Sequence, residues 1–208
     1  MTDFKKIKQF GLNDFNVHQR QLKYQGFFRI EEYAFSHRLF RGGNSSVVKR
    51  EIFERGDAVA LMIVDKQQQQ LLMIEQFRAG ALRSNENPWC VEFVAGMFDD
   101  DESAIDVAVR EAKEEANIDI EQAACHPVYQ FLPSPGGCSE KIHLYVAYVD
   151  LSSYQTGQHA GLATENEDIM VHKLSIADAV SLMEQGKVNN ATTIIGLQWL
   201  ALQFLPKP

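Results

Sequence analysis

Three glutamates lie close together in one stretch of the sequence, at positions 111, 114 and 115. If this stretch is helical, Glu111 and Glu115 stack on one face and Glu114 lies beside them. Like charges at that spacing destabilise a helix by roughly 0.2–0.5 kcal/mol, and a divalent cation would compensate for the repulsion. Ligands that are all oxygen suit magnesium or manganese rather than zinc. Glutamate-rich helices are more often simply solvated, so this stretch alone does not decide between the two interpretations.

The segment in front of these glutamates favours a metal site over a solvated helix face. Gly96 follows an apolar strand, and a glycine there allows the backbone to approach a ligand closely. Glu102 follows an acidic run at positions 99–101. Arg110 precedes Glu114 by four residues, so the two side chains can pair and Glu114 is held in place.

Three further segments carry candidate binding groups. Glu165 and Glu167 lie at alternate positions of an acidic segment, residues 161–168, for which a solvated turn is the better explanation on composition alone. Arg78 follows an apolar strand and is either a surface cation or a phosphate ligand, since its planar guanidinium suits phosphate. The loop Pro133–Gly137 is stiff at one end and permissive at the other, which suits ligand binding.

The hydrophobic pattern predicts the elements that must position these groups. A stripe of apolar residues at helical spacing predicts the first helix over Ser103–Ala116. Start and stop signals predict two more, Ser175–Gln185 and Ala191–Phe204, the latter ended by Pro206. The strands are expected at Phe27–Phe40, Val47–Phe53, Ala58–Val64, Leu71–Phe77, Trp89–Ala95, Val128–Leu132 and Ile142–Val149. Many strands around few helices indicate an α+β fold, with a mixed sheet sandwiched by helices.

The composition excludes several classes of protein. The net charge is −8 over 208 residues. Proteins that hold nucleic acid usually carry a basic face, so nucleic acid is not an expected partner. The apolar runs are too short to span a bilayer, and lysines near the N-terminus are not followed by the apolar segment of a secretory signal. The three cysteines form no CxxC pair and are expected to be idle thiols in a reducing cytosol, which predicts a cytoplasmic protein.

The spacing of these residues resembles the Nudix box, GX5EX7REUXEEXGU. The matching segment begins at Gly96, continues through Glu102 and ends in the run from Arg110 to Ile118, and eight of the nine specified positions agree. The departure is Asn117, where the family has glycine. That position closes the helix in a left-handed conformation, which asparagine tolerates better than most residues, so the helix end should be preserved.

From about residue 24 to the end, the chain is similar to the ADP-ribose diphosphatase branch of this superfamily. The likeness extends to Trp89–Met97, the loop at 134–137, the segment 165–167 and the C-terminal segment 197–200. The resemblance implies a homodimer whose subunits exchange N-terminal β regions and which splits ADP-ribose into AMP and ribose 5-phosphate. It therefore predicts an N-terminal antiparallel β region over residues 1–45 and a Nudix-type α/β/α sandwich over residues 46–208.

The resemblance also implies a role for each candidate residue. Glu111 and Glu115 would bind Mg²⁺, for which Mn²⁺ can substitute, together with the Ala95 carbonyl, Glu167 and Glu114. Glu165 would act as the general base. The phosphates, the adenine and the terminal ribose would be held by Arg78, Arg50, Glu51, Arg55, Phe27, Phe28, Met97, Ser134, Pro135, Gly136 and Glu140. Packing in the core or the dimer remains an equally good explanation for one of the two phenylalanines.

Three alternatives remain open at this point. The box sets the reaction and not the leaving group, so GDP-mannose or NADH could be the substrate. A regulatory module without catalysis would fit the same fold, although such modules commonly lose glutamates that this chain keeps. An acidic protein–protein adaptor would require the match to be accidental.

Overall fold

A computed structural model describes residues 7–84, 87–99 and 101–205 of the chain. The chain forms two compact units. The N-terminal unit comprises Met1–Arg55 and Ser134–Glu140, and the core unit comprises Gly56–Pro133 and Lys141–Pro208. The domain boundary predicted at residue 45 stays a prediction, because compactness within one chain does not decide which residues act together in an assembly.

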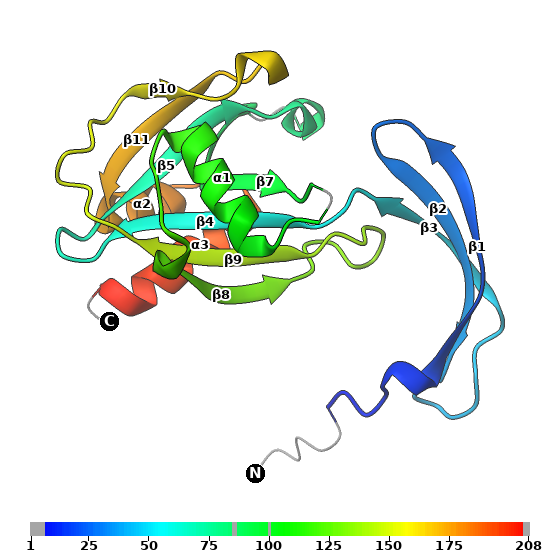
Figure 1. The fold of residues 1–208 in the computed structure, drawn as a ribbon. Coiled ribbons are helices and arrows are strands. Elements are labelled where there is room, and N and C mark those ends of the chain that lie inside the picture. Colours follow the sequence, from blue (N-terminus) through cyan, green and yellow to red (C-terminus); the bar gives the residue numbers. More distant parts are fainter. Residues whose placement is uncertain (1–6, 85–86, 100, 206–208) are drawn as a thin grey trace, which may run out of the picture. The chain divides into compact units, whose positions relative to one another are not determined.

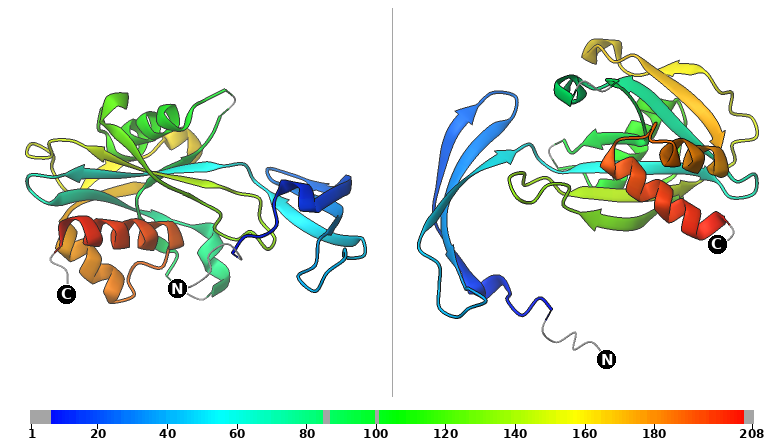
Figure 2. Two further views of the ribbon diagram at one scale, coloured as in Figure 1. Left: turned by 90° about the horizontal axis from the view of Figure 1, so that it is seen from below. Right: turned by 180° about the vertical axis from the view of Figure 1, so that it is seen from behind.

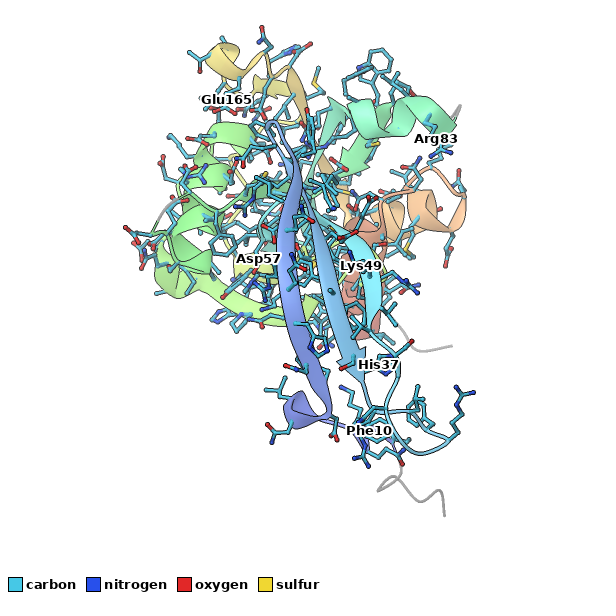
Figure 3. All side chains as sticks on the ribbon, turned by 90° about the vertical axis from the view of Figure 1, so that its right-hand side faces the viewer. Phe10, His37, Lys49, Asp57, Arg83 and Glu165 are labelled. Carbon is cyan, nitrogen blue, oxygen red and sulfur yellow. The ribbon has the colours of Figure 1, made fainter. Side chains whose placement is uncertain are left out.

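The N-terminal unit is a three-stranded antiparallel sheet in the order β1 (Phe15–Gln25), β2 (Arg29–His37) and β3 (Val48–Glu54) (Figure 1). Among the residues that the structure describes in this unit, Ala34 is the one buried hydrophobic residue. At one end, Phe10 and His37 lie close together (Figure 3) and line the same shallow pocket. This unit has very little apolar core of its own.

The core unit is built on an eight-stranded mixed sheet. Its main path runs in the order β10 (Gln158–Ala160), β11 (Ile169–Ser175), β5 (Gln70–Phe77), β4 (Ala58–Asp65), β9 (Ile142–Tyr148) and β8 (Cys125–Phe131). The pairing of β4 with β9 is parallel, and the other pairings are antiparallel. Two short strands complete the sheet, because β6 (Trp89–Glu92) pairs with β5 and β7 (Val94–Met97) pairs with β4.

Helices cover both faces of this sheet. Helix α1 (Ala104–Ala116) lies on one face, and α2 (Ile176–Glu184) and α3 (Ala191–Phe204) lie on the other (Figures 1 and 2). Alternate residues of β4 therefore enter two separate hydrophobic clusters, with Met62 facing α3 and Leu61 facing α1. Three short 3₁₀ turns flank the unit's loops, at Ala79–Ser84, Gln122–Ala124 and Ala163–Glu165.

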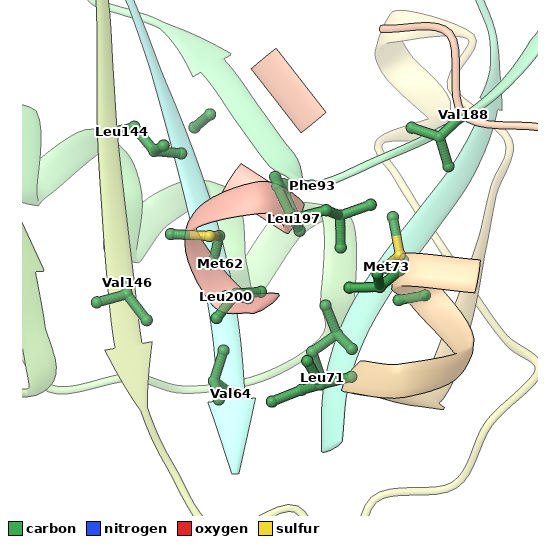
Figure 4. Packing of buried hydrophobic residues seen from close by; sticks show 14 of the residues in the cluster. Met62, Val64, Leu71, Met73, Phe93, Leu144, Val146, Val188, Leu197 and Leu200 are labelled. Carbon is green, nitrogen blue, oxygen red and sulfur yellow. The ribbon is translucent and has the colours of Figure 1, made fainter. Parts of the chain in front are cut away.

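The cluster beneath α3 shows why that helix can lie so close to the sheet. Phe93, Met62, Leu197 and Leu200 pack together there (Figure 4). Gly196 of α3 faces this cluster, and a Cβ at that position would lie 2.4 Å from a ring carbon of Phe93. A larger residue would therefore force the helix and the ring apart.

The predicted α+β class, the mixed sheet and its helical covering are confirmed. The three predicted helices agree with α1, α2 and α3 to within one residue at each end, although Pro206 lies outside the described residues. The single strand predicted at Trp89–Ala95 is wrong, because β6 and β7 are separated at Phe93 and pair with different neighbours. Strands β1, β10 and β11 were not predicted. Among the described residues, no helix is long and apolar enough to cross a membrane.

Candidate active site

Helix α1 presents the glutamates, and its two ends are fixed by local sequence. At the N-terminus the Ser103 hydroxyl accepts a hydrogen bond from the Asp106 N–H, and the Asp106 carboxylate accepts from the Ser103 N–H. At the other end Asn117 adopts the predicted left-handed conformation, with φ 51° and ψ 32°. The prediction for this departure from the Nudix box is confirmed, and the helix closes directly after Glu115 and Ala116.

Glu115 is the most deeply buried of the four glutamates of the box, with 2% of its surface exposed. One carboxylate oxygen accepts a hydrogen bond from the Ala95 N–H (2.8 Å), and the other accepts from Gln76 Nε2 (3.3 Å). Burial raises the pKa of Glu115 to about 8, against the lowering effect of the Ala95 N–H. This carboxylate is therefore held in place while lacking the positive charge that would fully compensate for its burial.

Glu111 lies against the glycine that opens the box. A Cβ added to Gly96 would stand 1.6 Å from Glu111 Oε1, so only glycine leaves room for this carboxylate beside the strand. Burial raises the pKa of Glu111 to about 7, and the guanidinium of Arg110 acts in the opposite direction. Gly96 was predicted to let the backbone approach a ligand, and the group that lies closest to it is the side chain of Glu111, a candidate ligand.

Arg110 forms hydrogen bonds with three acidic side chains of this cluster. Its Nη1 donates to Glu111 (2.7 Å) and to Glu114 (3.1 Å), which confirms the predicted pairing with Glu114. Its Nε and Nη2 each donate to Glu102 (3.0 Å), and Nη2 also donates to the Met97 carbonyl (3.2 Å). The hydrogen bond with Glu102 is the main reason that the pKa of Arg110 is raised. Arg110 thus supplies the positive charge in this cluster.

The oxygen ligands of this cluster suit a hard divalent cation, although the side chains are not gathered around one point as in a formed metal site. Across the described parts of the chain, no group of three or more His, Cys, Asp and Glu side chains is gathered so that it could hold a metal ion. Glu115, which is buried, and Glu111, which is partly buried, nonetheless offer oxygen ligands with raised pKa values, next to a glycine that leaves space. Carboxylates in that condition are stabilised in their charged form by a nearby cation.

Arg78 is the candidate phosphate ligand of the core unit. It follows β5, and its Nε donates to Glu92 Oε2 at 2.7 Å. Burial by itself would lower the pKa of Arg78, but the charge and hydrogen bond of Glu92 outweigh that effect and raise it. The side chain of Arg78 stays 41% exposed, whereas that of Glu92 is 6% exposed. Charges of Glu115 and Glu167 also raise the pKa of Arg78, so these groups share one electrostatic neighbourhood.

The segment that carries Glu165 and Glu167 follows β10 and is attached by hydrogen bonds to the C-terminal end of α1. The Gly161 N–H donates to the Glu114 carbonyl (3.0 Å), and Asn117 Nδ2 donates to the His159 carbonyl (3.1 Å). Glu167 is partly buried and accepts a hydrogen bond from the Leu162 N–H (3.3 Å). Glu165 is exposed (Figure 3), and its side chain makes no hydrogen bond with any described residue. The segment is thus anchored near the box glutamates, with Glu165 open to solvent.

The other predicted substrate residues, except Met97 of the core unit, belong to the N-terminal unit. Phe27 is 89% exposed and lies edge-on to Phe28, with ring centroids 4.7 Å apart. Both line a pocket of about 250 Å³. The guanidinium of Arg55 lies 5.5 Å from the centre of the Phe28 ring and pairs with Glu140 at 3.2 Å. These four residues form one cluster of aromatic and charged groups.

Arg50, Glu51 and the loop at Ser134–Gly136 are not part of that cluster. Arg50 and Glu51 are exposed on β3, and Arg50 Nη1 donates to the Lys49 carbonyl (2.7 Å). The loop residues are exposed too, and Cys138 N–H donates to the Ser134 carbonyl (2.9 Å). The structure therefore divides the predicted site residues into a set in the core unit and a set in the N-terminal unit.

Three residues near the candidate site were not predicted from the sequence. Gln76 holds Glu115, Glu92 holds Arg78, and Asn190 Nδ2 donates to Glu92 at 2.6 Å. A signal was present for the first two, because Gln76 and Glu92 are polar residues in strands that contain apolar runs. The sequence places Asn190 directly before a predicted helix, but nothing near it in the sequence indicates its contact with Glu92.

The core unit has helices on both sides of a mixed sheet, and it carries a glycine and glutamates at the spacing described above. Comparison with known protein families identifies the class of protein that has these features. The NUDIX domain matches residues 54–193, and the chain belongs to the Nudix family. It is 47% identical over 193 residues to an ADP-ribose pyrophosphatase of Escherichia coli K12, covering 93% of this chain and 90% of that protein. An ADP-ribose pyrophosphatase of Haemophilus influenzae is 40% identical over 203 residues, which cover 96% and 91% of the two chains. A GDP-mannose pyrophosphatase of Cronobacter sakazakii is 31% identical over 156 residues, covering 74% and 78%.

Proposed function

We propose that this protein hydrolyses the diphosphate bond of ADP-ribose to give AMP and ribose 5-phosphate. The observation that carries the proposal is the pair formed by the partly buried Glu111 and the buried Glu115 beside Gly96. This pair occurs in a chain that is 47% and 40% identical, over nearly its full length, to proteins named ADP-ribose pyrophosphatase. The reaction is that of a hydrolase acting on a phosphorus-containing anhydride.

The proposed cofactor is Mg²⁺, for which Mn²⁺ can substitute. Glu111, Glu115, Glu114 and Glu167 would hold the cation with the carbonyl of Ala95. A bound divalent cation neutralises diphosphate oxygens and acidifies water. An all-oxygen donor set supports magnesium over zinc. The raised pKa values of Glu111 and Glu115 support a cation as their counter-charge.

The remaining roles fall to side chains of the chain itself. Glu165 would take the proton from the attacking water, and its exposed position on an anchored segment allows it to approach substrate. Arg78 would bind a phosphate of the substrate, and the free end of its guanidinium suits bidentate contact. Arg110 would orient Glu111 and Glu114, as its hydrogen bonds already do.

The N-terminal unit would contribute the nucleoside end of the site. Phe27 and Phe28 would stack on adenine, with Arg55 beside them, and this role is supported by the pocket that the two rings line. Arg50 and Glu51 would help to hold the nucleoside. The terminal ribose would be held by Met97, Ser134, Pro135, Gly136 and Glu140.

The proposed assembly is a homodimer that exchanges its N-terminal β regions. The support is physical, because an antiparallel sheet with one buried hydrophobic residue among those described gains stability by packing against a second surface. A cytoplasmic location is proposed on the cysteines. Cys90 and Cys125 are buried and free, as is usual in a reducing compartment.

Hydrolysis of GDP-mannose is the second candidate, because a GDP-mannose pyrophosphatase is 31% identical to the chain. To decide, the full chain with Mg²⁺ is incubated separately with ADP-ribose, GDP-mannose and NADH. Released monophosphates are then separated by ion-exchange chromatography. The highest kcat/KM is expected for ADP-ribose, and none of the three should be cut in EDTA. Faster release of GMP from GDP-mannose would replace the proposed substrate. A complete absence of turnover with Mg²⁺ and with Mn²⁺ would indicate a regulatory module.

A further inference from the structure

We propose that Glu92 is a positioning residue that holds Arg78 in the orientation needed to bind a substrate phosphate, and that Asn190 holds Glu92. Arg78, Glu92 and Asn190 all belong to the core unit. The proposal deepens the proposed function and rests on it, because it assumes that Arg78 contacts a phosphate.

The hydrogen bond from Arg78 to Glu92 uses the guanidinium nitrogen that a phosphate does not need. Arg78 Nε donates to Glu92 Oε2 at 2.7 Å, and among the described residues none accepts a hydrogen bond from either Nη atom. A guanidinium presents five N–H donors in a rigid fork, so fixing Nε also fixes the direction of both Nη groups. The Nη pair thus remains available for a bidentate contact with a phosphate.

Glu92 itself is fixed from the opposite side. Its other oxygen, Oε1, accepts a hydrogen bond from Asn190 Nδ2 at 2.6 Å. The Asn190 amide cannot turn over without loss, because its oxygen accepts from the Thr193 N–H (3.0 Å) and caps helix α3. The start of α3 therefore sets the position of Glu92, and Glu92 sets that of Arg78.

Only a carboxylate satisfies both partners of Glu92. Arg78 Nε and Asn190 Nδ2 are both donors, so position 92 must offer two acceptors in a place that is 5% exposed. Glutamine has the same shape but one acceptor and one amide group, so Glu92→Gln must lose one of the two contacts. A buried ion pair is weak support for a purely stabilising role, because apolar replacements are often as stable.

A double-mutant cycle tests whether Glu92 acts through Arg78. The full chain is prepared as wild type, Arg78→Ala, Glu92→Gln and the double variant, and kcat and KM for ADP-ribose are measured with Mg²⁺. Glu92→Gln is expected to lower kcat/KM roughly tenfold, chiefly by raising KM. In the Arg78→Ala background the same change should have less than about a twofold effect, because residues that act as one unit are not additive.

Two further variants separate positioning from general damage to the fold. Asn190→Ser keeps a good N-cap for α3 but removes the donor to Glu92, so it should raise KM in the same direction as Glu92→Gln. Asp65→Asn is the matched control, because Asp65 is a buried carboxylate that accepts three backbone hydrogen bonds in the turn after β4 and at Leu151. It should lower the melting temperature and leave kcat/KM within about twofold of wild type.

The outcomes distinguish the inference from the function on which it rests. Additive losses in Glu92→Gln and Arg78→Ala would overturn the positioning role, while an active wild type would leave the proposed function standing. A wild type that does not cut ADP-ribose would overturn both. An equal loss of kcat/KM in Asp65→Asn would also overturn the inference, since any buried carboxylate would then have the same effect.

Discussion

Strand β4 of the core unit and strand β1 of the N-terminal unit belong to the same chain but differ in their surroundings. All eight residues of β4 are buried, whereas ten of the eleven residues of β1 are exposed. The exposed residues of β1 include Phe15, Leu22 and Tyr24, which are large and apolar or aromatic. A strand like β4 is specified by packing within its own unit, while a strand like β1 still has apolar surface to bury.

The two units are therefore expected to have different roles, one in the chemistry and the other in assembly. In the core unit, helices cover both faces of the sheet, and an ionisable group such as Glu115 is buried and held by two hydrogen bonds. In the N-terminal unit, contacts with a second copy would supply the missing burial. Changes in the core unit should therefore alter chemistry without altering assembly, and changes on β1 should alter assembly first.

Substitution of Glu115 tests whether the chemistry of the core unit is separate from assembly. Glu115→Gln keeps the shape of the side chain but removes its charge. The new amide still lies within hydrogen-bonding distance of Ala95 and Gln76. We expect kcat to fall by roughly 10²–10³-fold, since charge stabilisation in a buried site is lost. Sedimentation velocity should give the same oligomeric state as wild type. Near-normal turnover would mean that Glu115 is not a cation ligand.

Glu165 differs from Glu115 because it is an exposed residue within the core unit. A general base contributes roughly 10²–10⁴-fold, so Glu165→Gln should lower kcat about 10²-fold or more while KM changes little. Steady-state kinetics with ADP-ribose measure both constants, and Asp168→Asn, an exposed neighbour, is the matched control. A rise in KM at unchanged kcat would make Glu165 a substrate contact instead.

A charge placed on β1 tests whether this strand takes part in assembly. Leu22→Asp places a carboxylate where we expect apolar contact with a second copy, and the dimer should weaken at least about tenfold in Kd. Gln21→Asp is the control, since successive residues of a strand point to opposite faces. Sedimentation equilibrium over a range of concentrations measures both. An unchanged dimer in Leu22→Asp, or a monomeric wild type, would contradict the proposed exchange.

The smallest expected effect concerns stability without metal. Because the pKa of Glu115 is raised from 4.5 to about 8, the folded protein holds a proton that the unfolded chain releases. Its contribution to stability is therefore complete below about pH 4.5 and is lost as the pH rises toward 8. In EDTA, Glu115→Gln should melt at the same temperature as wild type near pH 5 and a few degrees higher near pH 9. Mg²⁺ should reverse this order at pH 9 by stabilising wild type. A difference that is independent of pH would contradict the assignment.

Local patterns in the sequence were enough to predict the core unit's helices. Each helix has a capping residue in front of it, Ser103, Ser175 and Asn190, whose side chain accepts a hydrogen bond from the backbone three residues on. Buried strands such as β4 are continuous apolar runs. By contrast β1 reads FNVHQRQLKYQ, which lacks an apolar run, because its pairing with β2 and not its own burial makes it a strand.

The candidate site was predictable where its residues are close in sequence. The spacing within one helix was sufficient to place Glu111, Glu114 and Glu115 together. The connection of Glu92 with Asn190 spans 98 residues, and hydrogen bonds at such separation leave no periodic trace in a single sequence. The break at Phe93 between β6 and β7 was missed for the same reason, since it depends on which neighbour each half joins.

The hydrogen bond between Gly161 and the end of α1 sets a limit on the travel of Glu165. Gly161 is held at the Glu114 carbonyl, and strand β11 begins at Ile169. Glu165 is four residues from each of these anchors, and an extended chain spans at most about 3.5 Å per residue. Its Cα can therefore swing no further than about 14 Å from either anchor while both hold. Insertion of glycines into this segment would enlarge the volume that the Glu165 carboxylate can reach. Its effective concentration at the substrate would then be lower.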